Sequence, residues 1–220
     1  MSAAMGLVVA VVLVGACDAA RAGKDALTGA SPPPANLQLQ DGDLVFHQSR
    51  SAQSAAVAAA TRSKYTHMGV VLLQGNKPLV LEAVQPTKLT PLAAWVARGD
   101  RGKVVIKRLK SANEVFTAEV RRRMHEMGRG WLGRPYDPLF QWTDDRLYCS
   151  ELVYKLLDRA AGVQVGKLQK ASDFNLSSPE VQEKLKERFG SGKATFNPDE
   201  RMVSPQSMFE DPKLLTVFEN

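Results

Sequence analysis

Short apolar runs, each bounded by turn residues, divide the middle of the chain into strands. Such runs occupy residues 44–47, 66–73, 79–84 and 103–109. The second and third runs are separated by residues 74–78, a turn that contains Gly75 and Asn76. Because strands joined by so short a turn favour a hairpin, we expect these two to pair antiparallel.

Helical periodicity and capping residues predict helices before, between and after these strands. The expected helices are one over 52–61 capped by Ser49 or Ser51, one from Pro91 to Gly99, a long one from Ser111 to about Met127, and two short ones starting at Ser178 and Ser204. The long helix begins at a capping box formed by Ser111 and Glu114. This order of helices and hairpin strands predicts an α+β domain with an antiparallel sheet.

A further helix follows the turn-rich segment 128–148 and carries the cysteine of the folded domain. From Cys149 onward the apolar residues recur at helical spacing, and Gly162 stands where a left-handed cap would end the helix; they are Leu152, Val153, Leu156, Leu157 and Ala160. The positive end of the helix dipole favours a thiolate at Cys149, the form that acts as a nucleophile. The same pattern also fits a small buried hydrophobic residue, so this stretch alone leaves both interpretations open.

The N-terminus has the pattern of an export signal. Residues 5–16 form an uncharged apolar run, too short for a bilayer-spanning helix of about 20 residues but suited to a secretory signal. Small residues directly before Cys17 resemble a bacterial lipobox, although the first four residues contain no Lys or Arg. We expect a signal over 1–16 and lipidation of Cys17; an ordinary cleaved signal ending at Ala19 or Ala22 and an uncleaved anchor are the alternatives.

Residues 17–38 are small, polar and rich in proline, which indicates a tether, and residues 39–220 then form one domain. We expect a membrane-anchored lipoprotein on the periplasmic side of the cell envelope, and a monomer. The chain contains two cysteines. If Cys17 is lipidated, Cys149 has no disulfide partner in an oxidising compartment, which favours a reactive thiol.

Composition and charge change this picture little. With 44% hydrophobic and 24% charged residues, the chain is an ordinary globular protein, and its net charge of +6 is compatible with an anionic partner. The densest basic cluster, residues 121–123, lies within the long helical pattern, where solvated surface accounts for it. No aromatic residues or base-reading motif accompany it, so we expect no nucleic-acid partner.

Two residues of the hairpin could complete a catalytic site with Cys149. His67 begins its strand, and Gly69, two residues on and on the same face, leaves room beside the imidazole. Glu82 should lie nearly opposite His67, close enough to orient the imidazole while His67 acts as a base for Cys149. Alternatively His67 is a satisfied core histidine and Glu82 an ion-pair partner. His47 and His125 are interpreted as structural and surface residues.

A zinc site built from these three residues would lack the usual ligand spacings, so no metal or cofactor is expected.

Four ordered segments carry a family resemblance. Residues 42–46, 65–69, 81–84 and 148–153 resemble the circularly permuted NlpC-type papain-like amidases of the YiiX-like group, in which the histidine precedes the cysteine. Residues 133–137 resemble the Gly-x-Pro-Tyr segment of the same superfamily. The similarity spans about residues 41–215. It implies a papain-like fold, with an antiparallel sheet packed against the helix that starts at the nucleophile.

The resemblance also implies roles for individual residues. Cys149 would be the nucleophile, His67 the general base and Glu82 the residue that orients His67. The remaining candidates, for an oxyanion hole or substrate contact, are Tyr148, Ser150, Asp43 and Tyr65.

We expect an envelope cysteine amidase or peptidase that acts on cell-wall peptide amides through a thioester, independent of metal. The alternatives are a lipid acyl hydrolase or acyltransferase with the same triad, and an inactive module that binds peptide or lipid.

Overall fold

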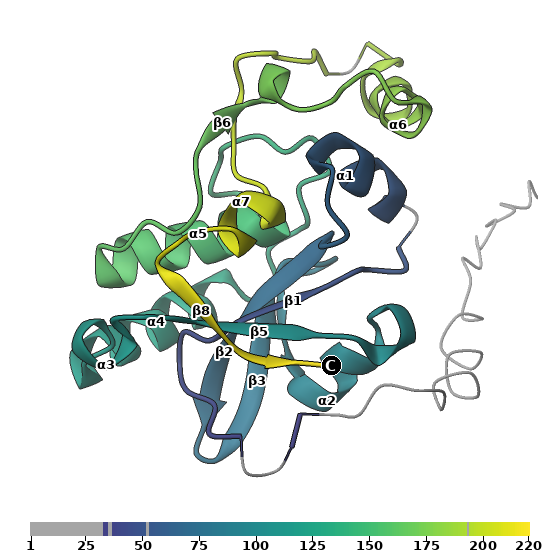
Figure 1. Cartoon of the computed structure of the whole chain (residues 1–220). Helices are drawn as coiled ribbons and strands as arrows, with labels where there is room; N and C mark the ends of the chain where they lie inside the picture. Colours follow the sequence, from purple (N-terminus) through teal and green to yellow (C-terminus); the bar gives the residue numbers. More distant parts are fainter. Residues whose placement is uncertain (1–32, 35–36, 52, 193) are drawn as a thin grey trace, which may run out of the picture.

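The computed structural model describes residues 33–34, 37–51, 53–192 and 194–220 (Figure 1). The expected signal over 1–16, the lipidation site Cys17 and most of the tether lie outside these residues. In the described part of the chain, no helix has both the length and the apolar character that crossing a bilayer requires.

A six-stranded antiparallel sheet forms the centre of the domain, with the strand order β4-β3-β2-β1-β5-β8. Its strands are β1 (Leu44–His47), β2 (His67–Gln74), β3 (Lys77–Glu82), β4 (Lys88–Pro91), β5 (Val105–Leu109) and β8 (Leu214–Glu219). A second, two-stranded sheet pairs β6 (Gln169–Lys170) with β7 (Arg201–Met202). The predicted α+β class with an antiparallel sheet is confirmed, whereas β4, β6, β7 and β8 were not predicted.

Helices cover both faces of this sheet and one of its ends. They are α1 (Ser54–Thr61), α2 (Leu92–Ala97), α3 (Ala112–Val115), α4 (Ala118–Trp131), α5 (Cys149–Ala161), α6 (Pro179–Phe189) and α7 (Pro205–Phe209), with 3-10 turns η1 (Asp100–Gly102) and η2 (Ala171–Asp173). The helices α4 and α5 share the larger core with one face, and α2 packs on the opposite face through Trp95. The helices α1 and α6 lie together beyond one end of the sheet, at the top of Figure 1.

Helix α5 begins and ends where its sequence predicts. Its first residue is Cys149, and Gly162 follows its last turn at φ +67°, where its N–H donates to the carbonyl of Asp158. Leu152 and Leu156 are fully buried against the sheet. The nucleophile candidate therefore stands at the end of a rigid, buried element.

The expected long helix after residue 111 is wrong, because the chain breaks between α3 and α4. Ser111 makes no capping bond, and Thr117 instead caps α4 by accepting from the backbone N of Val120 at 3.3 Å. The break lets the Phe116 ring enter the core beneath Gly42, where an added Cβ would lie 2.4 Å from that ring. Burial of this ring outweighs helix continuity.

Two further helix starts differ from their predictions. Neither Ser49 nor Ser51 caps α1, which begins after Gln53 without a side-chain bond; the backbone of Ser49 is instead held by Thr66 Oγ1 at 2.9 Å. Pro91 is not the first helical residue of α2. It ends strand β4, because pairing with β3 extends the chain up to that point.

Candidate active site

Cys149 is the first residue of α5 and is a free thiol that is 6% exposed. The turn before it is held by a capping box, in which Glu151 Oε2 accepts from the backbone N of Tyr148 at 3.2 Å. Because the first backbone N–H groups of a helix have no partner within the helix, this end of α5 favours negative charge on an oxygen bound there.

His67 is the first residue of β2 and lies between Cys149 and Glu82. Its Nε2 is 2.8 Å from Glu82 Oε2, and its side chain is 12% exposed. Cys149 lies close enough to the imidazole to influence its pKa, and because Nε2 is bound to Glu82, Nδ1 is the nitrogen left for the thiol. Burial lowers the pKa of His67, but the hydrogen bonds with Cys149 and Glu82 outweigh it and raise the pKa to about 9.

Glu82 ends β3 and is fully buried. Its Oε1 accepts from Thr90 Oγ1 at 2.6 Å and from the Arg98 guanidinium. Burial raises the pKa of Glu82, but hydrogen bonds from His67 and Thr90 and the charge of Arg98 lower it to about 2. The carboxylate is therefore ionised and can stabilise a protonated His67.

Thr90 and Arg98 were missed by the sequence reasoning. Thr90 lies on β4, opposite Val80 in the neighbouring strand, and Arg98 follows α2 directly. Recognising β4 as a strand could have placed Thr90 beside Glu82. No local signal identified Arg98.

The hairpin register differs from the expected one. The turn consists of Gly75 and Asn76 alone, because Gln74 pairs with Lys77. Continuing this register from the Val70–Leu81 pair places Glu82 opposite Gly69, so Glu82 reaches His67 on the diagonal. The expected register, with His67 and Glu82 nearly opposite one another, is thus off by two residues, and the two side chains do meet.

An aromatic stack supports His67 from the side of α2. His47 pairs with His67 across β1 and β2, and its ring stacks on Trp95 with centroids 3.9 Å apart. Burial and the neighbouring charge of His67 lower the pKa of His47. The His67 ring also stacks on Trp95, with centroids 5.9 Å apart, so His67 lies beside both rings. His125 lies elsewhere, on α4, with its Nε2 3.0 Å from Asp41.

Tyr136 is a further residue beside Cys149 that the sequence reasoning did not assign. Burial and the neighbouring Cys149 raise the pKa of the Tyr136 phenol, which therefore stays protonated. Gln53 Nε2 donates to the phenol oxygen at 2.6 Å, and Arg188 donates to Gln53 Oε1 at 2.9 Å. Because its oxygen accepts from Gln53, the phenol keeps its own proton to donate. The Gly-x-Pro-Tyr segment was the signal that could have identified it.

Tyr148 and Ser150 lie at the start of α5 but are engaged with another segment. The phenol oxygen of Tyr148 accepts from the backbone N of Val203 at 3.1 Å, and Ser150 Oγ donates to the Val203 carbonyl at 2.8 Å. Their side chains therefore hold residue 203 against the nucleophile helix, and both residues also line the cavity beside Cys149.

The other two candidates for an oxyanion hole or substrate contact, Asp43 and Tyr65, do not lie in the cavity beside Cys149. Asp43 is fully buried at the end of β1 opposite to His47, where both its oxygens accept from Arg108 at 2.7 Å. Tyr65 stacks on Phe209 with ring centroids 3.9 Å apart. Neither residue lines the cavity beside Cys149. Asp43 pairs with Arg108 and Tyr65 packs on Phe209.

That cavity is predominantly apolar and opens beside the thiol. Its walls come from α1, α6, residues 139–141 and the segment before α7, together with Tyr148, Cys149 and Ser150. The apolar side chains of these walls are those of Ala56, Val57, Ala60, Leu139, Phe140, Ala171, Phe174, Leu176, Val181, Leu185, Phe189, Phe196, Met202, Val203 and Pro205. A group attached to the reacting carbonyl would thus be surrounded by hydrocarbon.

Comparisons with known proteins show the family to which this chain belongs. The chain is 44% identical over 187 residues to an uncharacterized protein, YiiX, of Escherichia coli (strain K12), which covers 85% of this chain and 90% of that protein. It also matches the crystal structure of metalloprotein YiiX from Escherichia coli O157:H7 with a TM-score of 0.77 and 44% identity, over 83% of this chain and 98% of the other. Residues 38–218 match the family described as permuted papain-like amidase enzyme, YaeF/YiiX. The chain therefore belongs to the YaeF/YiiX family of permuted papain-like amidases.

Proposed function

We propose that this protein is a cysteine amidase or peptidase of the cell envelope that transfers an acyl group through a thioester. The observation that carries the proposal is the series Cys149, His67 and Glu82, in which the imidazole lies beside the thiol and the carboxylate is hydrogen-bonded to the imidazole. This is the arrangement that nucleophilic acyl transfer by cysteine requires.

In the first half of the reaction, the Cys149 thiolate attacks the carbonyl carbon of the amide. The oxygen then carries negative charge, which the Cys149 backbone N–H and the Tyr136 phenol would stabilise. His67, protonated and paired with Glu82, donates its proton to the departing amine, and the thioester remains. In the second half, His67 accepts a proton from water, the hydroxide attacks the thioester, and the acid leaves with the thiol restored.

The E. coli O157:H7 relative is described as a metalloprotein, which raises the question whether this chain binds a metal ion. Among the described residues, no group of three or more His, Cys, Asp and Glu side chains is arranged to hold a metal ion. His67 and Glu82 are already bound to each other and to Cys149, Thr90 and Arg98. These residues do not fit a metal site, and no step is assigned to one.

The proposed substrate is a cell-wall peptide amide. The proposed enzyme acts on it at the membrane, to which it is anchored through lipidated Cys17. The apolar run over residues 5–16 and the small residues before Cys17 support the anchor. One observation favours a second candidate, hydrolysis or transfer of a lipid acyl group. The cavity beside Cys149 is lined mostly by hydrocarbon, which suits an acyl chain better than a polar peptide.

The test compares the two substrates side by side. The purified protein is incubated with peptidoglycan fragments and with phospholipid vesicles, and the products are identified by mass spectrometry. Cys149→Ala and His67→Ala should abolish turnover, whereas His125→Ala should not, because His125 lies on α4 beside Asp41. Turnover that survives Cys149→Ala would refute the proposal, and binding without turnover would favour the inactive module.

A further inference from the structure

One wall of the cavity is a loop whose conformation its own residues do not explain. The pocket loop, residues 137–146, starts and ends at neighbouring points, because Tyr136 and Leu147 form a parallel bridge. Asp137 fixes the first half, since its carboxylate accepts from the backbone N of Leu139 and Gln141 at 2.9 and 2.6 Å. The second half has one internal backbone bond, from the N of Thr143 to the Gln141 carbonyl at 3.0 Å, and its other bonds go to residues outside the loop.

Phe140, on the pocket loop, has a strained backbone. Its φ of +55° lies in the left-handed region, which a bulky residue adopts only where its surroundings impose it. In this conformation its ring lines the cavity and meets the Tyr148 ring edge-on at 5.1 Å, and the Arg188 guanidinium lies over the Phe140 ring, 4.9 Å from its centroid. The position of this wall relative to Cys149 therefore depends on what holds the loop.

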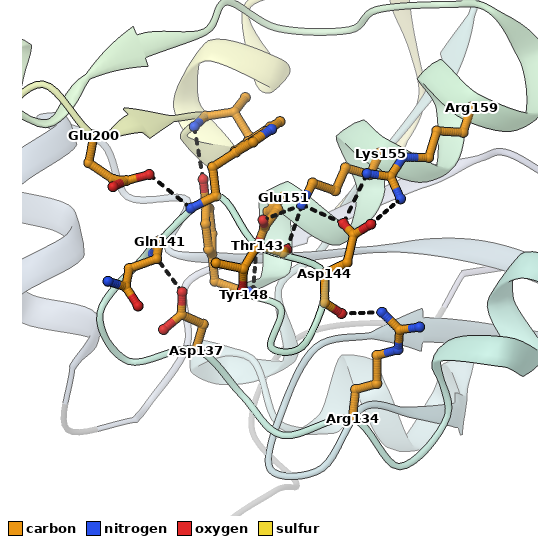
Figure 2. Close-up of polar contacts among 12 residues, drawn as sticks. Arg134, Asp137, Gln141, Thr143, Asp144, Tyr148, Glu151, Lys155, Arg159 and Glu200 are labelled. Atoms are coloured by element: carbon orange, nitrogen blue, oxygen red, sulfur yellow. Dashed lines mark hydrogen bonds and ion pairs between the residues drawn. The ribbon is translucent and has the colours of Figure 1, made fainter.

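Two anchors outside the loop hold its second half: Glu200 Oε1 accepts from the backbone N of Trp142 at 3.0 Å, and an ion cluster on α5 binds residues 143 and 144 (Figure 2). Lys155 is buried, and its ammonium donates to the Thr143 carbonyl at 2.6 Å and to Asp144 Oδ1 at 2.8 Å. Arg159, one turn further along α5, binds both oxygens of Asp144 at 2.8 and 2.9 Å. Arg134 donates to the Asp144 carbonyl from before the loop. Asp144 is thus bound from both sides.

The same cluster reaches the nucleophile turn. Lys155 donates to Glu151 Oε1 at 2.7 Å, and the other oxygen of this fully buried carboxylate accepts from the backbone N of Tyr148. Figure 2 shows Lys155 between Glu151 and Asp144. One buried ammonium therefore joins the residue next to Cys149 to the far end of the pocket loop. Such a cluster is costly to bury, so its contribution to stability alone is a weak explanation for it.

We propose that Asp144, Lys155 and Glu151 form a clamp of positioning residues that sets the distance between Cys149 and the Phe140 wall, and thereby selects the acyl group that the site accepts. This inference rests on the proposed function, because selection of an acyl group has meaning only at an acyl-transfer site. The clamp touches neither the thiol nor His67, so it governs the fit of the acyl group and not the reactivity of Cys149.

The test replaces Asp144, whose side chain is 51% exposed, so that no buried charge is created at the site of the change. For wild type and Asp144→Ala, kcat/KM is measured with 4-nitrophenyl acetate and 4-nitrophenyl octanoate, and alkylation of Cys149 is followed with iodoacetamide. The ratio of kcat/KM for the octanoate ester to that for the acetate ester should fall about tenfold in the variant, because a displaced Phe140 wall no longer fits a long acyl chain. The alkylation rate should be unchanged.

Three variants support this comparison. Asp144→Asn keeps one acceptor oxygen and should restore part of the ratio. Arg159→Met, which removes the bonds to Asp144 from the exposed side, should lower the ratio less than Asp144→Ala. Arg122→Met is the matched control, since Arg122 also binds carboxylates on an exposed helix face, those of Glu119 and Glu126 on α4; it should leave the ratio unchanged.

An unchanged ratio in Asp144→Ala would overturn the inference, as would an equal loss of ester hydrolysis and alkylation. Failure of the proposed function looks different, because the wild type would then hydrolyse neither ester. In that event the test measures how well octanoate, compared with acetate, protects Cys149 from iodoacetamide. This comparison then replaces the ratio of kcat/KM values. Selective protection in the wild type that Asp144→Ala loses would support the clamp, and equal protection in both would overturn it.

Discussion

Glu82 lies opposite Gly69 across β2 and β3, and its carboxylate extends along the diagonal to His67. A side chain at position 69 would collide with β3 beside this diagonal. A Cβ built on Gly69 would lie 2.4 Å from Val80 Cγ1, 2.8 Å from the Leu81 carbonyl and 3.5 Å from Glu82 Cβ. The absence of a side chain at position 69 thus lets β2 and β3 pack closely beside the Glu82 carboxylate.

Gly69→Ala should therefore disturb both stability and chemistry. The added methyl group contacts backbone as well as side chain, so we expect a loss of about 1–3 kcal/mol in the free energy of unfolding, measured in urea. Displacement of Glu82 should also slow alkylation of Cys149. Gly130→Ala is the control, because nothing lies near that site on α4 and alanine favours a helix by about 0.5–1 kcal/mol. Wild-type stability in Gly69→Ala would contradict the packing argument.

The pH dependence should report the pairing of His67 with Glu82. Because the pKa of His67 is raised to about 9, the protonated imidazole should be lost, and kcat/KM should fall, as the pH rises through about 9. Glu82→Gln removes part of what raises this pKa, so the alkaline limb should move to lower pH, and kcat/KM should drop about 100-fold.

Glu119→Gln, at an exposed pair on α4, is the control for this profile and should leave the limb in place. The acid side carries a second expectation. With a pKa of about 2, Glu82 stays ionised, and its contribution to stability is lost only as the pH falls from about 4.5 towards 2. An alkaline limb that Glu82→Gln does not move would show that Glu82 does not stabilise the imidazolium.

Tyr136→Phe should separate acyl transfer from thiol reactivity. Loss of a donor to the developing oxyanion should lower kcat for ester or amide hydrolysis about 100-fold. Alkylation by iodoacetamide builds no oxyanion, so its rate should not change. Tyr65→Phe is the matched control, since Tyr65 stacks on Phe209 away from the cavity. Equal losses in both reactions would assign Tyr136 a structural role instead.

Ala60→Phe should test whether the acyl group enters the apolar cavity. Ala60 lines it from α1, and a ring there would fill space that a long acyl chain needs. We expect KM for 4-nitrophenyl octanoate to rise about tenfold, with little change for the acetate ester. Ala55→Phe, on the exposed side of the same helix, should affect neither ester. A larger effect on the acetate ester would place the acyl chain outside the cavity.

The sequence could predict those parts of the site that local rules govern. Helix α5 starts at Cys149 and stops before Gly162, as periodicity and the glycine cap indicate. The hairpin register was misjudged, yet by two residues, and a shift of two keeps side chains on the same face of a strand. The predicted contact between His67 and Glu82 therefore survives this error. An error of one residue would have placed the two side chains on opposite faces of the sheet.

What the sequence alone determined was the order of His67, Glu82 and Cys149 and the elements that carry them, because periods of two and of about 3.6 residues are local properties of the chain. Only the tertiary structure decided what surrounds them. Thr90 and Arg98 meet Glu82 after β4 joins the sheet, and Lys155 meets Asp144 after the pocket loop folds back on α5. Contacts between distant segments depend on which buried charges find partners in the packed domain, and no local pattern encodes that pairing.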